Sequence, residues 1–367
     1  STENMLPEKG GITDSSYPPT SKTVSSFKTN DVLVSNIRPY FKKIWFADFD
    51  GGCSNDVIVF KSNDDNLIPK FLYYQLSKDE FFDFMMSGAN GTKMPRGNRK
   101  AIPKFKLLLP PLHTQRRIAD ILSAYDNLIE NNLKRIKLLE QAAQNIYKEW
   151  FVNLRFPGHE NTAINEETGL PKGWEIKRSD EVFKINIGKT PPRKESEWFS
   201  IEDGYKWVSI SDMNKSSVFI QKTKERITDT GVSRFNVKVV PKGTVLLSFK
   251  LTIGSVVIAT EDMVTNEAIA HFNIDKNTSL STEYTYCHLS CFPYKTLGST
   301  SSIGQALNSK IVKSIPVLLP QQDLVSLFTK RVKPTFLQLE NLITQNQKLK
   351  AARDILLPRL MNRTIEV

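Results

Sequence analysis

The segment LPPLHTQRRIADILSAYDNLIENNLKRIKLLEQAAQNIYKEWF, residues 109–151, is the longest regular stretch of the chain. Its apolar residues recur in alternating steps of four and three, and neither glycine nor proline occurs between Thr114 and Phe151. A repeat of about 3.5 residues is typical of a helix that packs along a seam against another helix. At about 1.5 Å per residue this helix would span roughly 55 Å, which exceeds the width of a small domain. We therefore expect it to project from, or to bridge, the globular parts of the protein.

A second run with the same pattern, residues 321–361, supplies a partner for this helix in the same chain. Pro334 interrupts the second run, so we expect a short helix followed by a long one. One polar residue, Asn132, falls in the seam of the first run, where it can fix the register of the pair at some cost in stability. The residues expected to form the seam include Ile118, Leu122, Tyr125, Ile129, Asn132, Ile136, Leu139, Leu342, Leu349 and Leu356.

The two helical runs belong to an internal repeat, in a chain of 367 residues that is long enough for two domains. KLLLPP, residues 106–111, and VLLPQQ, residues 317–322, lead into the two runs about 210 residues apart. Upstream, DVLVSNIRPYFKKIWFA, residues 31–47, parallels TVLLSFKLTIGSVVIAT, residues 244–260. A further strand and one amphipathic helix follow in each copy. The sequence therefore predicts an α+β fold in which each strand-rich globule is followed by one long helix.

This order of segments resembles the specificity subunits of type I restriction-modification systems. LLLPPLHTQRRIADILSAYDNLIENN, LPKGWEIKRSDEVFKINIGKTPP and VPKGTVLLSFKLTIGSVVIATEDMVTNEAIA carry the resemblance, which covers nearly the whole chain. It implies two mixed α/β target recognition domains, each reading one half of a split DNA site. The two long helices would pack antiparallel as a coiled-coil spacer, and two modification subunits would bind the assembly. We expect the domains at residues 1–108 and 157–319 and the spacer helices at residues 109–156 and 320–367.

The first copy departs from the pattern of the second. About 55 residues, 170–226, precede the ITD that begins at Ile227, whereas eleven residues precede the ITD that begins at Ile12. The first copy therefore lacks a counterpart of GWE, GKTPP and WVSISDM. We expect either a truncated or rearranged chain, or a first domain that is completed by residues outside this sequence.

The sequence carries no motif for catalysis. An adenine methyltransferase needs a glycine-rich turn for its cofactor and an Asn/Asp-Pro-Pro-aromatic loop for the flipped base, and neither occurs. The ATP-binding pattern G-x-x-x-x-G-K-[ST] is also missing. CHLSC, residues 287–291, suits buried cysteines on one helix face better than a metal site. We expect a non-catalytic subunit without a cofactor or metal of its own, with S-adenosylmethionine, ATP and magnesium on its modification and restriction (translocase) partners.

The net charge of +11 and the isoelectric point near 9.3 favour a polyanionic partner. The segment NGTKMPRGNRKAIPKFK, residues 90–106, concentrates positive charge and contains no acid, which suits contacts to phosphates and guanine edges. A second basic loop, GKTPPRKESEW, begins at Gly188. The residues predicted to contact duplex DNA are Lys93, Arg96, Arg99, Lys100, Lys189, Thr190, Arg193, Lys194, Ser211, Lys250, Gln305, Asn308 and Lys310.

Composition also bears on the location of the protein. Three cysteines do not form a disulfide framework, no apolar run reaches the length of a membrane span, and the N-terminal residues do not resemble a signal peptide. We therefore expect a cytoplasmic protein with no membrane partner. Two alternatives stay open: a self-contained methyltransferase or nuclease, against which the missing motifs argue, and a coiled-coil adaptor without DNA contact, against which the basic loops argue.

Overall fold

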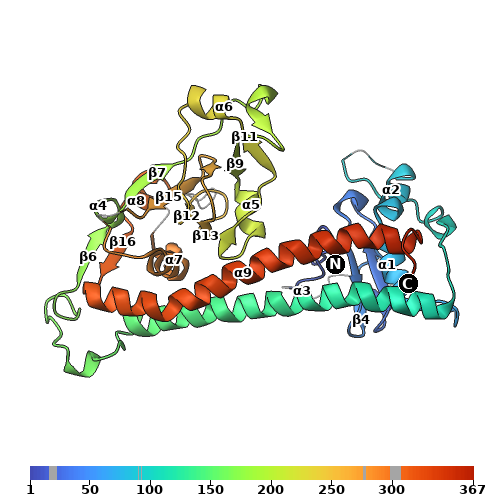
Figure 1. Cartoon of the computed structure of the whole chain (residues 1–367), viewed down its shortest axis with the longest axis horizontal. Helices are drawn as coiled ribbons and strands as arrows, with labels where there is room; N and C mark the ends of the chain where they lie inside the picture. Colours follow the sequence, from blue (N-terminus) through green and yellow to red (C-terminus); the bar gives the residue numbers. More distant parts are fainter. Residues whose placement is uncertain (16–22, 90, 92, 276–277, 298–306) are drawn as a thin grey trace. The chain divides into compact units, whose positions relative to one another are not determined.

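The computed structural model describes residues 1–15, 23–89, 91, 93–275, 278–297 and 307–367. The chain divides into two compact units (Figure 1). The first unit comprises Ser1–Glu130 and Lys348–Val367, and the second comprises Asn131–Gln347. Both long helices, α3 (Leu112–Tyr147) and α9 (Gln322–Met361), therefore contribute residues to each unit.

The two predicted long helices are present, but the predicted break at Pro334 is wrong. Helix α9 runs without interruption from Gln322 to Met361, through Pro334. Proline removes one backbone hydrogen bond from a helix. Val332 and Phe336, on either side of it, are both buried in one hydrophobic cluster, so side-chain packing holds the helix together there. Helix α3 continues beyond Tyr147 as a π-helical turn, η3 (Lys148–Val152).

The second unit is built on a five-stranded sheet with β12 (Val245–Ser248) at its centre. Every residue of β12 and of the neighbouring strand β13 (Val256–Ala259) is buried, as expected for strands covered on both faces. The sheet has the order β10 (Phe219–Ile220), β13 (Val256–Ala259), β12, β15 (Ile269–Asn273) and β7 (Lys184–Ile187). A second sheet has the order β14 (Val264–Thr265), β9 (Tyr205–Val208), β11 (Glu225–Ile227) and β8 (Phe199–Ser200), and β16 (Pro316–Leu319) pairs with β6 (Glu175–Arg178). The shorter helices are α4 (Ser179–Val182), α5 (Ile210–Lys215), α6 (Asp229–Arg234), α7 (Thr282–Cys291), α8 (Ser309–Lys313), η4 (His159–Asn161), η5 (Ser196–Trp198) and η6 (Tyr294–Leu297).

The first unit contains a smaller sheet. The sequence predicted one amphipathic helix after the third strand of this unit, but the structure has two. The first helix ends because the Ser77 hydroxyl donates to the Tyr73 carbonyl (2.7 Å) and Lys78 adopts an extended backbone. Its elements are the sheet β3 (Ile44–Phe46), β2 (Val32–Ser35) and β5 (Val57–Phe60), the pair β1 (Ser25–Phe27) and β4 (Gly51–Cys53), and the helices α1 (Pro69–Leu76), α2 (Asp79–Ser87), η1 (Pro39–Phe41) and η2 (Ile102–Lys104).

The predicted internal repeat is confirmed by the strand pairing. In the first unit β2 pairs antiparallel with both β3 and β5, and in the second unit β12 pairs antiparallel with both β13 and β15. A short helix then covers the sheet in each copy, α1 in the first and α7 in the second, and the other side of that helix packs on the long helices. Figure 1 shows α7 beside α9 in this way. Each unit is thus layered as sheet, short helix and long-helix pair.

The two sheets differ at their edges. Strands β7 and β10, which flank the sheet of the second unit, both come from residues 170–226, the stretch without a counterpart in the first copy. Within the described part of the chain, the outer edges of β3 and β5 pair with no further strand. The difference between the copies that is visible in the sequence therefore corresponds to two flanking strands.

The predicted seam residues line the contact between the long helices. In the first unit Ile118 and Leu122 of α3 cluster with Leu360 of α9, and in the second unit Ile136 clusters with Leu342. Six of the ten predicted positions are buried, namely Ile118, Leu122, Ile129, Asn132, Ile136 and Leu342. The other four are half-buried, namely Tyr125, Leu139, Leu349 and Leu356.

Polar groups interrupt the seam once in each unit. In the second unit the Asn132 amide donates to Asn346 Oδ1 and Gln345 Oε1, both at 3.0 Å, and Asn132 is 0% exposed. In the first unit Asp126 accepts from the Arg353 guanidinium at 2.7 Å. Sequence reasoning missed Asn346 and Arg353. Counting back from Leu360 by alternating fours and threes would have found both residues.

Replacing Asn132 with alanine should destabilise the protein by about 1–3 kcal/mol, because it leaves the buried Asn346 amide without its donor. Urea unfolding of this variant against Asn131→Ala, which truncates an exposed neighbour on the same helix, measures the effect. Equal midpoints for the two variants would contradict the role assigned to the buried pair. The double replacement of Asn132 and Asn346 by leucine should recover stability, since it removes both buried amides together.

Candidate nucleic-acid interface

The β12–β13 hairpin of the second unit ends in a tightly held apex. The Thr252 N–H donates to the Lys250 carbonyl (2.8 Å), so the turn closes over a single residue, Leu251, whose φ is +65°. The Gly254 N–H donates to the Ser248 carbonyl (3.0 Å) one step below. Lys250, a predicted DNA contact, is exposed beside this apex.

Helix α5 lies next to the apex and carries another predicted contact. The Ser209 hydroxyl accepts from the Asp212 N–H (3.3 Å), and the Asp212 carboxylate accepts from the Ser209 N–H (3.0 Å), which fixes the start of the helix. The Asn214 amide donates to the Thr252 hydroxyl (3.2 Å) and so ties α5 to the hairpin. Ser211 is exposed on α5. Asn214, which directly follows the SISDM segment, was not predicted, because its partner Thr252 is distant in the sequence.

The basic loop that begins at Gly188 is largely engaged within the protein. Lys189 donates from its ammonium group to the Phe235 carbonyl (2.8 Å), and the Thr190 hydroxyl donates to the Glu267 carboxylate. Lys194 extends from the loop with an exposed side chain.

Arg193 is the most constrained member of that loop. Its guanidinium donates to the Glu225 carboxylate (2.7 Å) and stacks 4.2 Å from the Trp207 ring centroid and 4.3 Å from that of Phe199. Cation–π stacking and a charge-assisted hydrogen bond together hold the group in one orientation. Arg193 therefore braces the loop against the second sheet.

Backbone hydrogen bonds bring the hairpin apex and the basic loop to the same turn. The Phe249 N–H donates to the Ala268 carbonyl (3.0 Å), and the Lys189 N–H donates to the Thr265 carbonyl (3.0 Å). The apex and the start of the loop thus flank the segment between β14 and β15, in which Glu267 is exposed. Lys250 and Lys189, two of the predicted contacts, therefore belong to segments that are hydrogen-bonded to this turn.

The remaining predicted contacts of the second unit lie near α8. Gln305 is outside the residues that the structure describes. The Asn308 side chain caps α8 by accepting from the Ile311 N–H (2.9 Å), and Lys310 is exposed on the same helix. The Leu307 N–H donates to the Phe249 carbonyl (3.0 Å), which ties this segment to the hairpin.

The first unit repeats this tie between hairpin and loop. The Gly97 N–H donates to the Asn36 carbonyl (3.1 Å), and the Arg38 N–H donates to the Pro95 carbonyl (2.8 Å). The predicted residues of the basic loop are therefore held beside the β2–β3 hairpin. Those residues are Lys93, Arg96, Arg99 and Lys100, all exposed.

Two of these arginines have partners in the protein. Arg96 forms an ion pair with Asp56 at 3.4 Å, and the Arg99 guanidinium donates to the Asn55 carbonyl. The side chains of Arg96 and Asp56 are 57% and 37% exposed, so solvent screens the pair and its net stabilisation is small.

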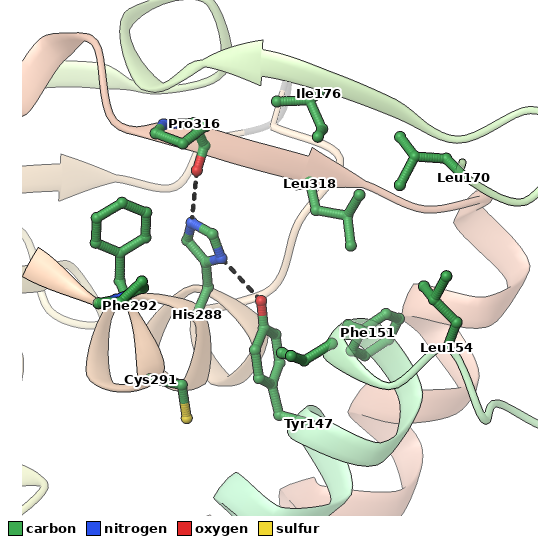
Figure 2. Close-up of a pocket in the computed structure, with 12 residues that line it drawn as sticks. Tyr147, Phe151, Leu154, Leu170, Ile176, His288, Cys291, Phe292, Pro316 and Leu318 are labelled. Carbon is green, nitrogen blue, oxygen red and sulfur yellow. Dashed lines mark hydrogen bonds between the residues drawn. The ribbon is translucent and has the colours of Figure 1, made fainter. Parts of the chain in front are cut away.

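An apolar pocket of about 340 Å³ in the second unit is lined in part by His288, the histidine of the CHLSC segment (Figure 2). His288 Nδ1 lies 2.8 Å from the Tyr147 hydroxyl, and Nε2 lies 3.1 Å from the Pro316 carbonyl oxygen. A carbonyl oxygen only accepts, so Nε2 carries the proton and the Tyr147 hydroxyl donates to Nδ1. Burial lowers the pKa of His288 to about 4, so the imidazole is neutral at pH 7.

This pocket does not have the arrangement of a hydrolytic or metal centre. Burial raises the pKa of the Cys291 thiol, the opposite of what a nucleophilic thiolate requires. In the described ranges no three His, Cys, Asp or Glu side chains are grouped so that they could hold a metal ion. The equivalent residue in the first copy is Gln75. Its amide likewise donates to a carbonyl in the segment before a long helix, namely the Leu108 carbonyl (3.0 Å). His288 is thus a buried hydrogen-bonding residue.

Stability should fall as the pH drops from about 6.5 to about 4, because His288 binds its proton more tightly in the unfolded chain than in the folded one. Its contribution is roughly 2–4 kcal/mol by pH 4. The variant His288→Gln introduces the residue found at the equivalent position of the first copy, Gln75. Its amide can still donate to the Pro316 carbonyl but does not titrate. The free energy of unfolding in urea should therefore depend less on pH in this range. His271, whose pKa burial also lowers to about 4, remains as a background common to both proteins. Identical profiles would contradict the assignment.

Among the helices formed by the described residues, none is long and apolar enough to cross a membrane.

Comparison with known proteins identifies the family. The family model of the type I restriction modification DNA specificity domain matches residues 8–141 and 171–350. The HindI type I restriction enzyme specificity subunit of Haemophilus influenzae is 26% identical, over 92% of this chain and 87% of that protein. The MjaIX type I restriction enzyme specificity subunit of Methanocaldococcus jannaschii is 24% identical, over 81% of this chain and 69% of that protein. The crystal structure of a type I restriction-modification S subunit from M. genitalium, 18% identical, covers 98% of this chain and 91% of that one with a TM-score of 0.54, which supports the fold. With both of its halves matched by one domain family, the chain belongs to the family of type I restriction-modification specificity subunits.

Proposed function

We propose that this protein is the DNA sequence-recognition subunit of a type I restriction-modification enzyme and has no catalytic activity of its own. The observation that carries the proposal is the repeated arrangement in which a β-hairpin is tied to an adjacent polar or basic loop, once in each unit. Two copies of one recognition device suit a bipartite target in duplex DNA. Residues 1–108 and 157–319 then act as the two target recognition domains.

Within each domain, basic residues set the register and a few side chains at the hairpin identify bases. Phosphate contacts position a protein on DNA, whereas contacts to base edges specify the sequence. Lys93, Lys100 and Lys194 are exposed and suited to phosphates. The major groove, about 12 Å wide, admits a two-stranded hairpin. The hairpin apex is therefore the part of each domain that enters the groove.

The long helices α3 and α9 serve as an antiparallel coiled-coil spacer between the domains. The alternating seam supports this role, since a sustained seam with polar interruptions gives a pair of helices with one register. The enzyme assembled on this chain contains two modification subunits that bind S-adenosylmethionine and restriction subunits that use ATP and magnesium. Its DNA substrate places the complex in the cytoplasm.

Purified with its modification subunits, the chain should direct methylation to a split sequence with a fixed gap, which methylation mapping of genomic DNA reveals. Without those subunits it should show no methyl transfer, DNA cleavage or ATP hydrolysis. Turnover that follows the isolated chain through successive columns would contradict the non-catalytic assignment. Methylation at a single undivided sequence would contradict the use of two domains.

Replacing Lys93, Arg96 and Lys100 together by alanine should weaken DNA binding and flatten its dependence on salt. Each lost phosphate contact removes roughly one unit from the slope of log K against log salt concentration. Fluorescence anisotropy with a duplex over a salt series measures the slope.

The matched control replaces three exposed basic residues of the long helices by alanine, namely Arg135, Lys137 and Lys330. This triple variant has the same net charge as the loop variant. If DNA meets the loop, the control keeps a slope close to that of the unmodified protein. Equal slopes for the two variants would show that net charge, and not the loop, determines binding.

A further inference from the structure

The apex of the hairpin carries an unfavourable backbone conformation in both units. Leu251 has φ +65°, and Arg38, at the equivalent position between β2 and β3, has φ +49°. Few residues other than glycine adopt positive φ, and a leucine side chain has no polar group that could form a local hydrogen bond to stabilise it. Such strain persists where the surrounding structure imposes it, and it is concentrated at functional sites.

The apex of the second unit is both exposed and rigid. The Leu251 side chain is 85% exposed, although the strands on either side of it are buried. The Ser248 hydroxyl holds the base of the turn by donating to the Thr252 carbonyl and accepting from the Ser255 N–H (3.1 Å). The hairpin therefore presents an apolar side chain to solvent in one fixed position, with little further entropy to lose on binding.

The surroundings of Leu251 indicate what it meets. Its neighbours Lys250 and Thr252 are exposed, and Asn214 and Lys215 of α5 are exposed close by. A protein-binding site would need a contiguous apolar patch, whereas Leu251 is one apolar group within a basic and polar frame. The C5-methyl group of thymine is the apolar group that a base pair offers in the major groove, between rows of phosphates.

The first unit places a different residue in the same position. Arg38 is held by the hydrogen bond from its own N–H to the Pro95 carbonyl (2.8 Å), and its Nε is buried without a hydrogen-bond partner in the described structure. Arginine pairs with the N7 and O6 acceptors of guanine. The chain after Arg38 continues as the 3-10 helix η1, whereas the chain after Leu251 closes in a tight turn. The two units thus present different residues at this position, as two unlike half-sites require.

We propose that the apex residue of each hairpin reads one base pair, Leu251 by contact with a thymine methyl group and Arg38 by hydrogen bonds to a guanine. The proposal rests on the proposed DNA-recognition function and names the side chains that discriminate between bases within it. Sequence reasoning had assigned these roles to the flanking polar residues.

The test removes the methyl group and the side chain separately. Starting from the mapped target, each thymine of one half-site is replaced in turn by deoxyuridine, which lacks only the C5-methyl group. The unmodified protein should lose roughly fourfold in affinity at one position, the effect of one buried methyl-sized group. Leu251→Gly should bind the thymine and deoxyuridine duplexes equally. Because glycine adopts positive φ without strain, this variant should melt at the same or a higher temperature.

Ile201→Ala is the matched control, because Ile201 is an apolar residue of the same unit that is 82% exposed. It should retain the full response to deoxyuridine. In the other half-site, replacing one guanine by 7-deazaguanine removes the N7 acceptor, and Arg38→Ala should be insensitive to that change.

Two results would overturn the proposal. One is a protein that responds to no deoxyuridine substitution in either half-site, and the other is a Leu251→Gly variant that responds as the unmodified protein does. Failure of the proposed function would look different, since the unmodified protein in its complex would then direct methylation to no defined sequence at all.

Discussion

The hydrogen bond between Asn132 and Asn346 joins the two long helices within the apolar seam of the second unit. Both side chains lie in the seam of the long helices, 0% and 5% exposed, and a slide of one helix by a heptad would break the hydrogen bond between them. An unpaired buried amide costs about 1–3 kcal/mol, enough to select one register. In the first unit an ion pair between Asp126 and Arg353 joins the same two helices. A fixed register in turn fixes which faces of α3 and α9 receive the sheet-covering helices.

Carboxylates on α3 also connect the long helices to the globular layers. Tyr74 of α1 donates its hydroxyl to Asp126, and Tyr286 of α7 donates to Glu140, each at 2.7 Å. Burial and the neighbouring carboxylate raise the pKa of both tyrosines, so these hydroxyls stay protonated as donors. In each unit, therefore, the short helix that covers the sheet is anchored to α3, and this anchoring orients the sheet and its hairpin relative to the long helices. Each unit thus holds its hairpin on the same layers of sheet, short helix and long helices, while the residue at the apex differs between the units.

The sequence was most informative where a repeat or a period exists. The α+β class, the paired copies and the long helices follow from the 3.5-residue seam and from the parallel order of segments. The break at Pro334 was wrongly predicted, because burial of Val332 and Phe336 outweighs one lost hydrogen bond. The surface was least predictable. Basic residues in GKTPPRK suggested free DNA contacts, yet Arg193 is held by Glu225 and Trp207, which are distant in sequence. Leu251 was missed because apolar residues usually signal a core, and its positive φ is visible only in the fold.

The claim that the long helices set the distance between the two half-sites is tested most directly by lengthening them. Seven residues, one heptad, would be inserted into α3 between Glu130 and Asn131 and into α9 between Gln347 and Lys348, where the two compact units divide. This adds roughly 10 Å while the seam stays in phase. At about 3.4 Å per base pair, methylation mapping should show a gap that is about three base pairs longer between unchanged half-sites. An unchanged gap, or new half-site sequences at the old gap, would show that the helix pair does not determine the spacing.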